Sequence, residues 1–215
     1  MEKGPMVTIT ISRQMGSGGS YIGRLVARHL GFRYIDKEIL YEAAKRLGTD
    51  EKYLEGRDQK SSGFIDNFLR TLAYGNAPVA IPPVGPPVSD SDLFTLECTI
   101  MEEIARRGGS VIVGRGAFQV LRDLPGAVRI FIHAPLEFRT KRIMQFQDLA
   151  DVKQAESKLR ESDEQKSKFV WDMLHVRWAD ARNYHLCVDT SLMDFDSVTQ
   201  LICQLVEKIK HALSG

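Results

Sequence analysis

A glycine-rich segment near the N-terminus has the residue types and spacing of a phosphate-binding site. It reads GSGGS and stands between an alternating apolar run and an amphipathic stretch. Small residues at the start of a helix present backbone N–H groups to an anion, and the helix dipole favours negative charge there. We therefore predict phosphate binding by Gly16, Ser17, Gly18, Gly19 and Ser20. The alternative is a tight strand-to-helix turn that needs glycine for its backbone shape and binds nothing.

This segment departs from the Walker A pattern G-x-x-x-x-G-K-[ST] at one position. Gly19 stands where the pattern has lysine, while Ser20 keeps the hydroxyl that reaches Mg²⁺. The lysine normally bridges the β- and γ-phosphates and neutralises charge during transfer. Arg13 occupies the first glycine position of the pattern, and its planar guanidinium is the predicted replacement.

One carboxylate is a candidate for the magnesium site. Asp36 ends the second predicted strand, and we predict that it orients water ligands of Mg²⁺. The competing interpretation makes Asp36 the N-cap of a helix that begins at Lys37.

The hydrophobic pattern predicts the scaffold that positions these residues. Strand patterns occur near residues 7–12, 33–36, 110–114, 127–133 and 184–189, with helical periodicity between them. Strands that alternate with helices predict an α/β fold with a five-stranded, parallel, doubly wound sheet. Ligands bind such sheets at the carboxyl ends of the strands. The glycine-rich loop, Asp36, the GRG turn at 114–116 and the DTS segment at 189–191 are therefore expected along one edge.

The composition limits the classes of function. The 215 residues, 43% of them hydrophobic, suffice for one compact domain. A formal net charge of +1 lacks the basic excess of nucleic-acid-binding proteins, so no such partner is predicted. The sequence has neither a secretory-signal pattern nor an apolar stretch near the ~18 residues of a membrane span. Its three cysteines form no C-x-x-C pair, so we predict a cytoplasmic protein without a membrane partner.

The N-terminal segment ITISRQMGSGGSYIGRLVARHLGFRYIDKEIL resembles the start of the cytidylate kinase-like proteins, a branch of the nucleoside monophosphate kinases. In that branch the loop typically reads S-R-x-x-G-S-G-G and the second strand ends Y-x-D-K-E. Similar segments follow at VIVGRGA, VRIFIHAPLEFRTKRI, SDEQKSKF and WADARNYHLCVDTS. The resemblance implies a P-loop nucleotide-kinase fold, with ATP and Mg²⁺ as donor and CMP or dCMP as acceptor. It also implies that the Walker A lysine is commonly absent in this family.

The resemblance further implies a domain plan and a set of arginine contacts. It divides a single domain, 1–215, into a core (1–48 and 101–215), an NMP-binding insert (about 49–100) and a lid (about 144–170). By matching positions, Arg115 is expected to face the acceptor, and Arg139 and Arg142 to contact the donor. Lys166 and Arg160 are expected to clamp phosphate from the lid.

Several positions depart from the family pattern and leave the activity open. Gly116 replaces an aspartate, Glu42 stands where an arginine holds the acceptor phosphate, and Lys166 and Phe169 replace arginine and tyrosine of D-x-x-R-x-x-Y. The chain is thus expected to be an ATP-dependent kinase of a nucleotide or another small metabolite, or a nucleotide-binding regulatory protein that has lost transfer. The Pro-rich stretch at 78–87 is expected to be a surface connector or a substrate-facing flap, and it offers an apolar surface for a homodimer.

Overall fold

A parallel sheet forms the centre of the described chain. The structure, a computed structural model, describes residues 6–36, 90–147 and 151–214. Within these ranges the strands are β1 (Thr8–Arg13), β2 (Arg33–Ile35), β3 (Ser110–Val113), β4 (Ala127–His133) and β5 (Leu186–Asp189). Neighbouring strands are parallel, in the order β2-β3-β1-β4-β5. The predicted five-stranded parallel sheet is confirmed.

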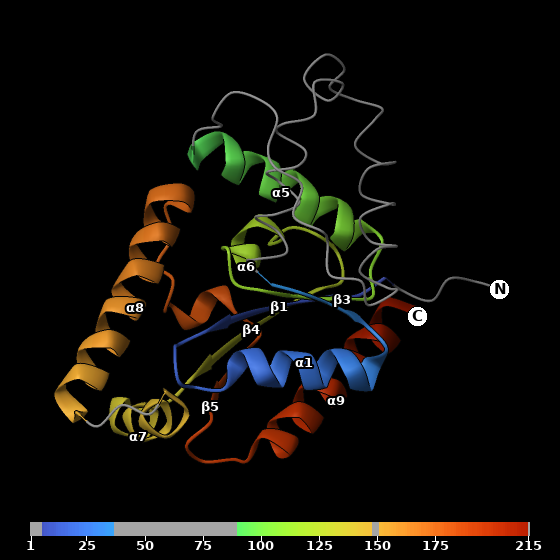
Figure 1. Ribbon diagram of the computed structural model, residues 1–215. Coiled ribbons are helices and arrows are strands. Elements are labelled where there is room, and N and C mark those ends of the chain that lie inside the picture. Colours follow the sequence, from blue (N-terminus) through green and yellow to red (C-terminus); the bar gives the residue numbers. More distant parts are fainter. Residues whose placement is uncertain (1–5, 37–89, 148–150, 215) are drawn as a thin grey trace, which may run out of the picture.

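Helices cover both faces of this sheet (Figure 1). One face carries α1 (Gly19–Leu30) and α9 (Phe195–Ser214), and the other carries α5 (Asp90–Arg106) and the short α6 (Ala117–Val120). Beside the sheet, α7 (Leu136–Gln147) packs against α8 (Val152–Leu174), and a short 3-10 helix (Ala181–Asn183) precedes β5. The doubly wound arrangement is confirmed as well.

The first strand and helix show how local sequence leads to this packing. Residues 8–11 of β1 alternate threonine and isoleucine, and all are buried because β1 lies between β3 and β4. Branched side chains of this kind pack well on a pleated sheet. In α1, Ile22 and Val26 stand four positions apart and are both buried against the sheet. Gly31 ends the helix as predicted, because its φ of 65° lies in the region that favours glycine.

Several predicted features belong to residues 37–89. The predicted second helix, the Pro-rich stretch at 78–87 and Glu42 lie outside the described residues. The described helix α5 crosses residue 100 without a break, and Leu93, Ile100 and Ile104 are buried in one core cluster. The packing of α5 thus continues on the N-terminal side of residue 101, and the division into core, insert and lid stays a prediction.

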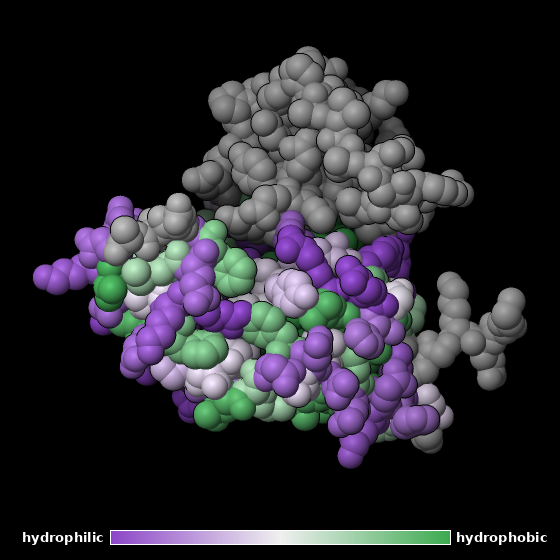
Figure 2. Space-filling model, turned by 60° about the horizontal axis from the view of Figure 1, so that its bottom comes forward, coloured by the Kyte–Doolittle hydropathy of each residue, from purple (hydrophilic) through white to green (hydrophobic). Residues whose placement is uncertain are grey.

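The surface of the described chain is mixed in polarity. On the face seen in Figure 2, hydrophobic and hydrophilic residues are interspersed rather than gathered by kind. Single exposed apolar side chains are normal on a solvent-facing surface. In the part of the chain that the structure describes, no helix combines the length and the apolar composition needed to cross a membrane.

Candidate functional site

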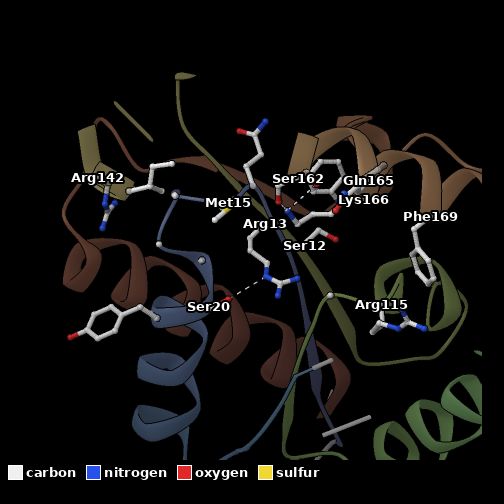
Figure 3. A pocket seen from close by; sticks show the side chains of 18 of the residues that line it. Ser12, Arg13, Met15, Ser20, Arg115, Arg142, Ser162, Gln165, Lys166 and Phe169 are labelled. Carbon is white, nitrogen blue, oxygen red and sulfur yellow. Dashed lines mark hydrogen bonds between the residues drawn. The ribbon is translucent and has the colours of Figure 1, made fainter. Parts of the chain in front are cut away.

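A cavity of about 1020 Å³ opens at the carboxyl edge of the sheet, next to the glycine-rich loop (Figure 3). The cavity is lined by the end of β1, the glycine-rich loop and the start of α1, by the turn after β3, and by the facing sides of α7 and α8. Trp178 and Phe195 complete the lining. Its polar side chains include Arg13, Ser20, Arg115, Arg142, Ser162 and Lys166. The prediction that the loop and the GRG turn meet at one edge is confirmed, at the place where such sheets bind ligands.

The glycine-rich loop turns the chain from β1 into α1. Gly16 and Gly18 have φ of 79° and 82°, in the left-handed region that glycine adopts without steric cost. Gly18 directly precedes α1, and no side chain caps the N-terminus of the helix. Gly16, Gly18, Gly19 and Ser20 form part of the cavity wall. The first N–H groups of α1 lie at this wall without a side-chain cap.

We expect Gly16→Ala to lower the free energy of unfolding by about 2–3 kcal/mol. A Cβ at this position would lie 3.0 Å from Arg139 Cβ and 3.1 Å from the Arg139 carbonyl oxygen, at a φ that already disfavours alanine. The matched control is Gly31→Ala, where φ is 65° and no other part of the described chain lies within 4 Å. Only backbone strain of about 1 kcal/mol remains there. Urea denaturation compares the variants, and equal losses would contradict the crowding at Gly16.

Ser17 fixes the shape of the loop through both its side chain and its backbone. Its hydroxyl is buried and donates a hydrogen bond to the carbonyl of Gln14 at 2.8 Å. Its own carbonyl accepts a hydrogen bond from Thr190 Oγ1 at 2.7 Å, which ties the loop to the segment after β5. Ser17 is absent from the cavity wall, and its own N–H donates a hydrogen bond to the Gln14 carbonyl at 3.3 Å. Ser17 therefore holds the shape of the loop, and its contact with phosphate stays a prediction.

The Walker A pattern has glycine at position 13 and lysine at position 19, whereas this chain has arginine at position 13 and glycine at position 19. A Cβ built at Gly19 would lie 2.5 Å from the Cβ and 3.1 Å from the Cγ of Arg13. A lysine therefore does not fit at position 19 while arginine occupies position 13. The Arg13 side chain lines the cavity, and its Nε donates a hydrogen bond to Ser20 Oγ at 3.2 Å (Figure 3). A cation therefore lies beside the loop, and it belongs to Arg13 at the end of β1.

The two predicted magnesium residues lie in different surroundings. Ser20 lines the cavity at the start of α1, where a hydroxyl fits the Mg²⁺ ligand of a Walker A loop. Asp36 does not line the cavity, and its carboxylate lies 3.8 Å from the guanidinium of Arg24. Across the described ranges, no three His, Cys, Asp or Glu side chains gather into a metal site. The role of Asp36 stays a prediction, as does its alternative as an N-cap, because Lys37 lies outside the described residues.

Arg139 braces the loop and does not line the cavity. Its buried guanidinium lies 2.9 Å from the Asp163 carboxylate and donates to the carbonyls of Ala134 at 2.9 Å and Met15 at 3.2 Å. Gln14 joins this network, because its amide nitrogen donates to Asp163 at 3.2 Å. In this geometry the charge of Arg139 is engaged by Asp163 and supports the loop from behind, and the expected donor contact stays a prediction.

Arg160 also lies away from the cavity. Its side chain is 64% exposed, and its guanidinium is 4.0 Å from Glu156 one turn earlier on α8. Asp163 and Lys166 turn inward from the same helix, whereas Arg160 is directed to solvent. In this geometry Arg160 does not reach the cavity, and its contact with a phosphate stays a prediction.

Lys166 lines the cavity from α8, where the sequence places it. Its Nζ lies 3.2 Å from the carbonyl oxygen of Ser162 and 5.9 Å from the centre of the Trp178 ring. Ser162, Lys166 and Phe169 share the face of α8 that borders the cavity. Of the five predicted catalytic residues, the structure brings together Arg13, Arg115 and Lys166.

An aromatic wall at the cavity is not predicted by the sequence analysis. The Arg142 guanidinium lies 4.0 Å from the centre of the Phe195 ring, and the Tyr21 ring lies 5.5 Å from the same ring. Gly18 permits this packing, because a Cβ there would overlap Phe195. A planar cation stacked on a ring suits contact with a nucleobase. The signal for Phe195 was its place just after the DTS segment, at the edge where the site was expected.

Arg115 lines the cavity from the turn after β3. Its Nε lies 2.6 Å from Glu97 Oε2, and its guanidinium lies 4.3 Å from the centre of the Phe169 ring. At Gly116, φ is 70° and the Leu174 side chain fills the space that a Cβ would need. An aspartate at position 116 would therefore strain the backbone and require the Leu174 side chain at the end of α8 to move.

Comparison with known proteins identifies the family. Residues 8–192 match the model described as the cytidylate kinase-like family. The chain belongs to the cytidylate kinase-like family. A relative named cytidylate kinase, from Methanocaldococcus jannaschii, is 23% identical over 209 residues, which cover 94% of this chain and 98% of the relative. The resemblance inferred from the sequence is confirmed.

Solved structures support the architecture of this family member. An uncharacterized protein from Eubacterium ventriosum has a TM-score of 0.69 at 23% identity, covering 94% of this chain and 98% of its own. A gluconokinase from Sinorhizobium meliloti has a TM-score of 0.56 at 15% identity, covering 99% and 98%. At these identities the likeness concerns the fold alone. The predicted P-loop nucleotide-kinase fold is confirmed.

Proposed function

We propose that this protein transfers a phosphoryl group from ATP to a nucleoside monophosphate, with CMP or dCMP as the first candidates. The observation that carries the proposal is the contact of Arg13 with Ser20 on the cavity wall, since it supplies the cation that the Walker A lysine would provide. Membership of the cytidylate kinase-like family, and a relative that bears the name cytidylate kinase, support the same reaction class.

The donor half of the cavity has a role for each of its residues. The N–H groups of the loop and of α1 bind the phosphates, and Arg13 neutralises their charge. Arg142 and Phe195 offer a stacking surface for the base. Ser20 would hold Mg²⁺, which neutralises phosphate charge when bound. Catalysis then consists of positioning and charge stabilisation, because phosphoryl transfer requires little covalent chemistry from the protein.

The acceptor half is less polar than the family pattern implies. Arg115 and Lys166 supply its positive charges, while Phe169, Val170 and Trp178 supply apolar surface. Without a carboxylate at position 116, one contact to the acceptor is lost. This loss favours two further candidates: a kinase of another small metabolite, and a nucleotide-binding regulatory protein with little or no transfer.

Single-turnover ADP release separates these candidates. The full chain is mixed with ATP and Mg²⁺ and with each of CMP, dCMP, UMP, AMP and GMP, and the thermal shift with ATP alone is measured in parallel. We expect ADP release that depends on a pyrimidine monophosphate. ATP-induced stabilisation without release for any acceptor would favour the regulatory protein. The absence of both would overturn nucleotide binding, because a ligand of the folded state must raise its stability.

A further inference from the structure

A buried carboxylate lies behind the cavity and has no part in the roles above. Glu97 on α5 is 0% exposed. Its Oε2 accepts hydrogen bonds from Arg115, and its Oε1 has no hydrogen-bond partner within the described chain. Burial raises the pKa of Glu97, although the Arg115 charge acts in the opposite direction. A buried carboxylate with one oxygen unpaired is costly to desolvate, which directs attention to what it does for Arg115.

Arg115 is held by three side chains at once. Glu97 binds the edge formed by Nε and Nη2. The rings of Phe94 and Phe169 lie with their centres 5.6 Å and 4.3 Å from its guanidinium carbon, and they meet edge to face at 5.3 Å. Arg115 also has a φ of 54°, a backbone conformation that costs free energy in a residue other than glycine. Strain of this kind persists only where the surroundings fix it, and it is concentrated at functional sites.

The hydrogen bonds to Glu97 determine which part of the arginine remains for a ligand. Because the carboxylate takes the Nε–Nη2 edge, the Nη1–Nη2 edge is the one left for a group in the cavity that Arg115 lines. We propose that Glu97 is a positioning residue, which fixes Arg115 so that this edge meets the phosphate of the acceptor. The inference rests on the proposed function.

Positioning and affinity respond in opposite directions when Glu97 loses its charge. The Glu97–Arg115 pair carries no net charge, so Glu97 weakens the attraction for an anionic acceptor while it fixes the donor groups in place. Removing its charge frees the arginine and makes the site more positive. We therefore expect the alignment of the acceptor, and with it kcat, to decrease while the affinity for the acceptor is kept.

The first test is steady-state kinetics of Glu97→Gln with the acceptor that the full chain uses best. We expect kcat to fall about 10- to 100-fold, with an unchanged or lower acceptor KM. The urea midpoint should change little, because the substitution removes a fully buried charge while the Arg115 side chain, 24% exposed, keeps access to water. The matched control is Glu102→Gln, a half-exposed glutamate of the same helix, which should leave all three values unchanged. A kcat within about twofold of the parent, or a higher KM at unchanged kcat, would overturn the inference.

A second test does not depend on turnover. Phenylglyoxal condenses with the guanidino nitrogens of arginine, so an arginine whose Nη2 is no longer held by a carboxylate should react faster. Mass spectrometry should show labelling of Arg115 at least about fivefold faster in Glu97→Gln than in the parent chain, with no change in Glu102→Gln. An equal labelling rate in Glu97→Gln and the parent chain would contradict the inference that Glu97 holds Arg115 in place. Faster labelling in a chain that uses no acceptor would support that holding and overturn the proposed function.

Discussion

Arg13→Ala is expected to lower the single-turnover rate of phosphoryl transfer about 100- to 1000-fold, the usual loss when a fixed electrostatic contributor is removed. The guanidinium of Arg13 is the proposed replacement for the Walker A lysine, and its Nε donates a hydrogen bond to Ser20 Oγ at 3.2 Å. The measurement is ADP release after rapid mixing, together with the affinity for ATP by calorimetry. Full activity and full ATP affinity in this variant would contradict the role of Arg13.

The exchange between positions 13 and 19 provides a rescue experiment. Gly19→Lys alone should fail, because its Cβ would lie 2.5 Å from Arg13 Cβ. Alanine at position 13 keeps this obstacle, whereas Arg13→Gly removes it. The double variant Arg13→Gly/Gly19→Lys should therefore recover at least about tenfold over Arg13→Gly, because it restores the lysine of the Walker pattern. Recovery requires only a small shift of Ile132, whose Cβ would lie 3.3 Å away. No recovery would indicate that Arg13 acts otherwise than as a replacement cation.

The second large effect is expected for Arg139→Ala, which should lower the free energy of unfolding by about 3 kcal/mol. The substitution leaves the Asp163 carboxylate without its ion pair and the Met15 carbonyl without its donor. The loop should lose its support, so the affinity for ATP should fall as well. Urea denaturation and calorimetry measure the two effects.

Two further variants separate the ion pair from general damage to the fold. Arg160→Ala is the matched control, because its side chain is 64% exposed and its loss should change stability by less than about 0.5 kcal/mol. Asp163→Asn combined with Arg139→Ala should be less destabilising than the sum of the single variants, since each removes the same interaction. Additive effects would contradict a direct coupling between Arg139 and Asp163.

The sequence predicts the fold from local signals. The alternation in residues 7–12 and the glycine at position 31 determine β1 and the end of α1 without knowledge of their neighbours. The edge rule then places Arg13 and Arg115 near each other, which the cavity confirms. The cytoplasmic location, the homodimer and the absence of a nucleic-acid partner stay predictions.

The remaining part of the site depends on contacts between distant segments. Helical periodicity shows that Arg139 and Arg160 belong to helices. It does not show that Arg139 pairs with Asp163 whereas Arg160 is exposed to solvent. In the same way, nothing near Gly116 in the sequence announces that Leu174 fills the space beside it. Glu97 lies 18 residues before its partner Arg115, on a helix whose pattern resembles any amphipathic helix.

Helix α8 makes one rigid connection between the two halves of the cavity. It has 23 residues, which span roughly 35 Å. It contacts the network behind the glycine-rich loop, the proposed donor side, through Asp163, and the turn after β3, the proposed acceptor side, through Phe169 and Leu174. A ligand that displaces α8 at one half therefore changes the binding free energy at the other. Thermodynamic linkage requires this change to be reciprocal, so donor and acceptor should alter each other's dissociation constant by the same factor.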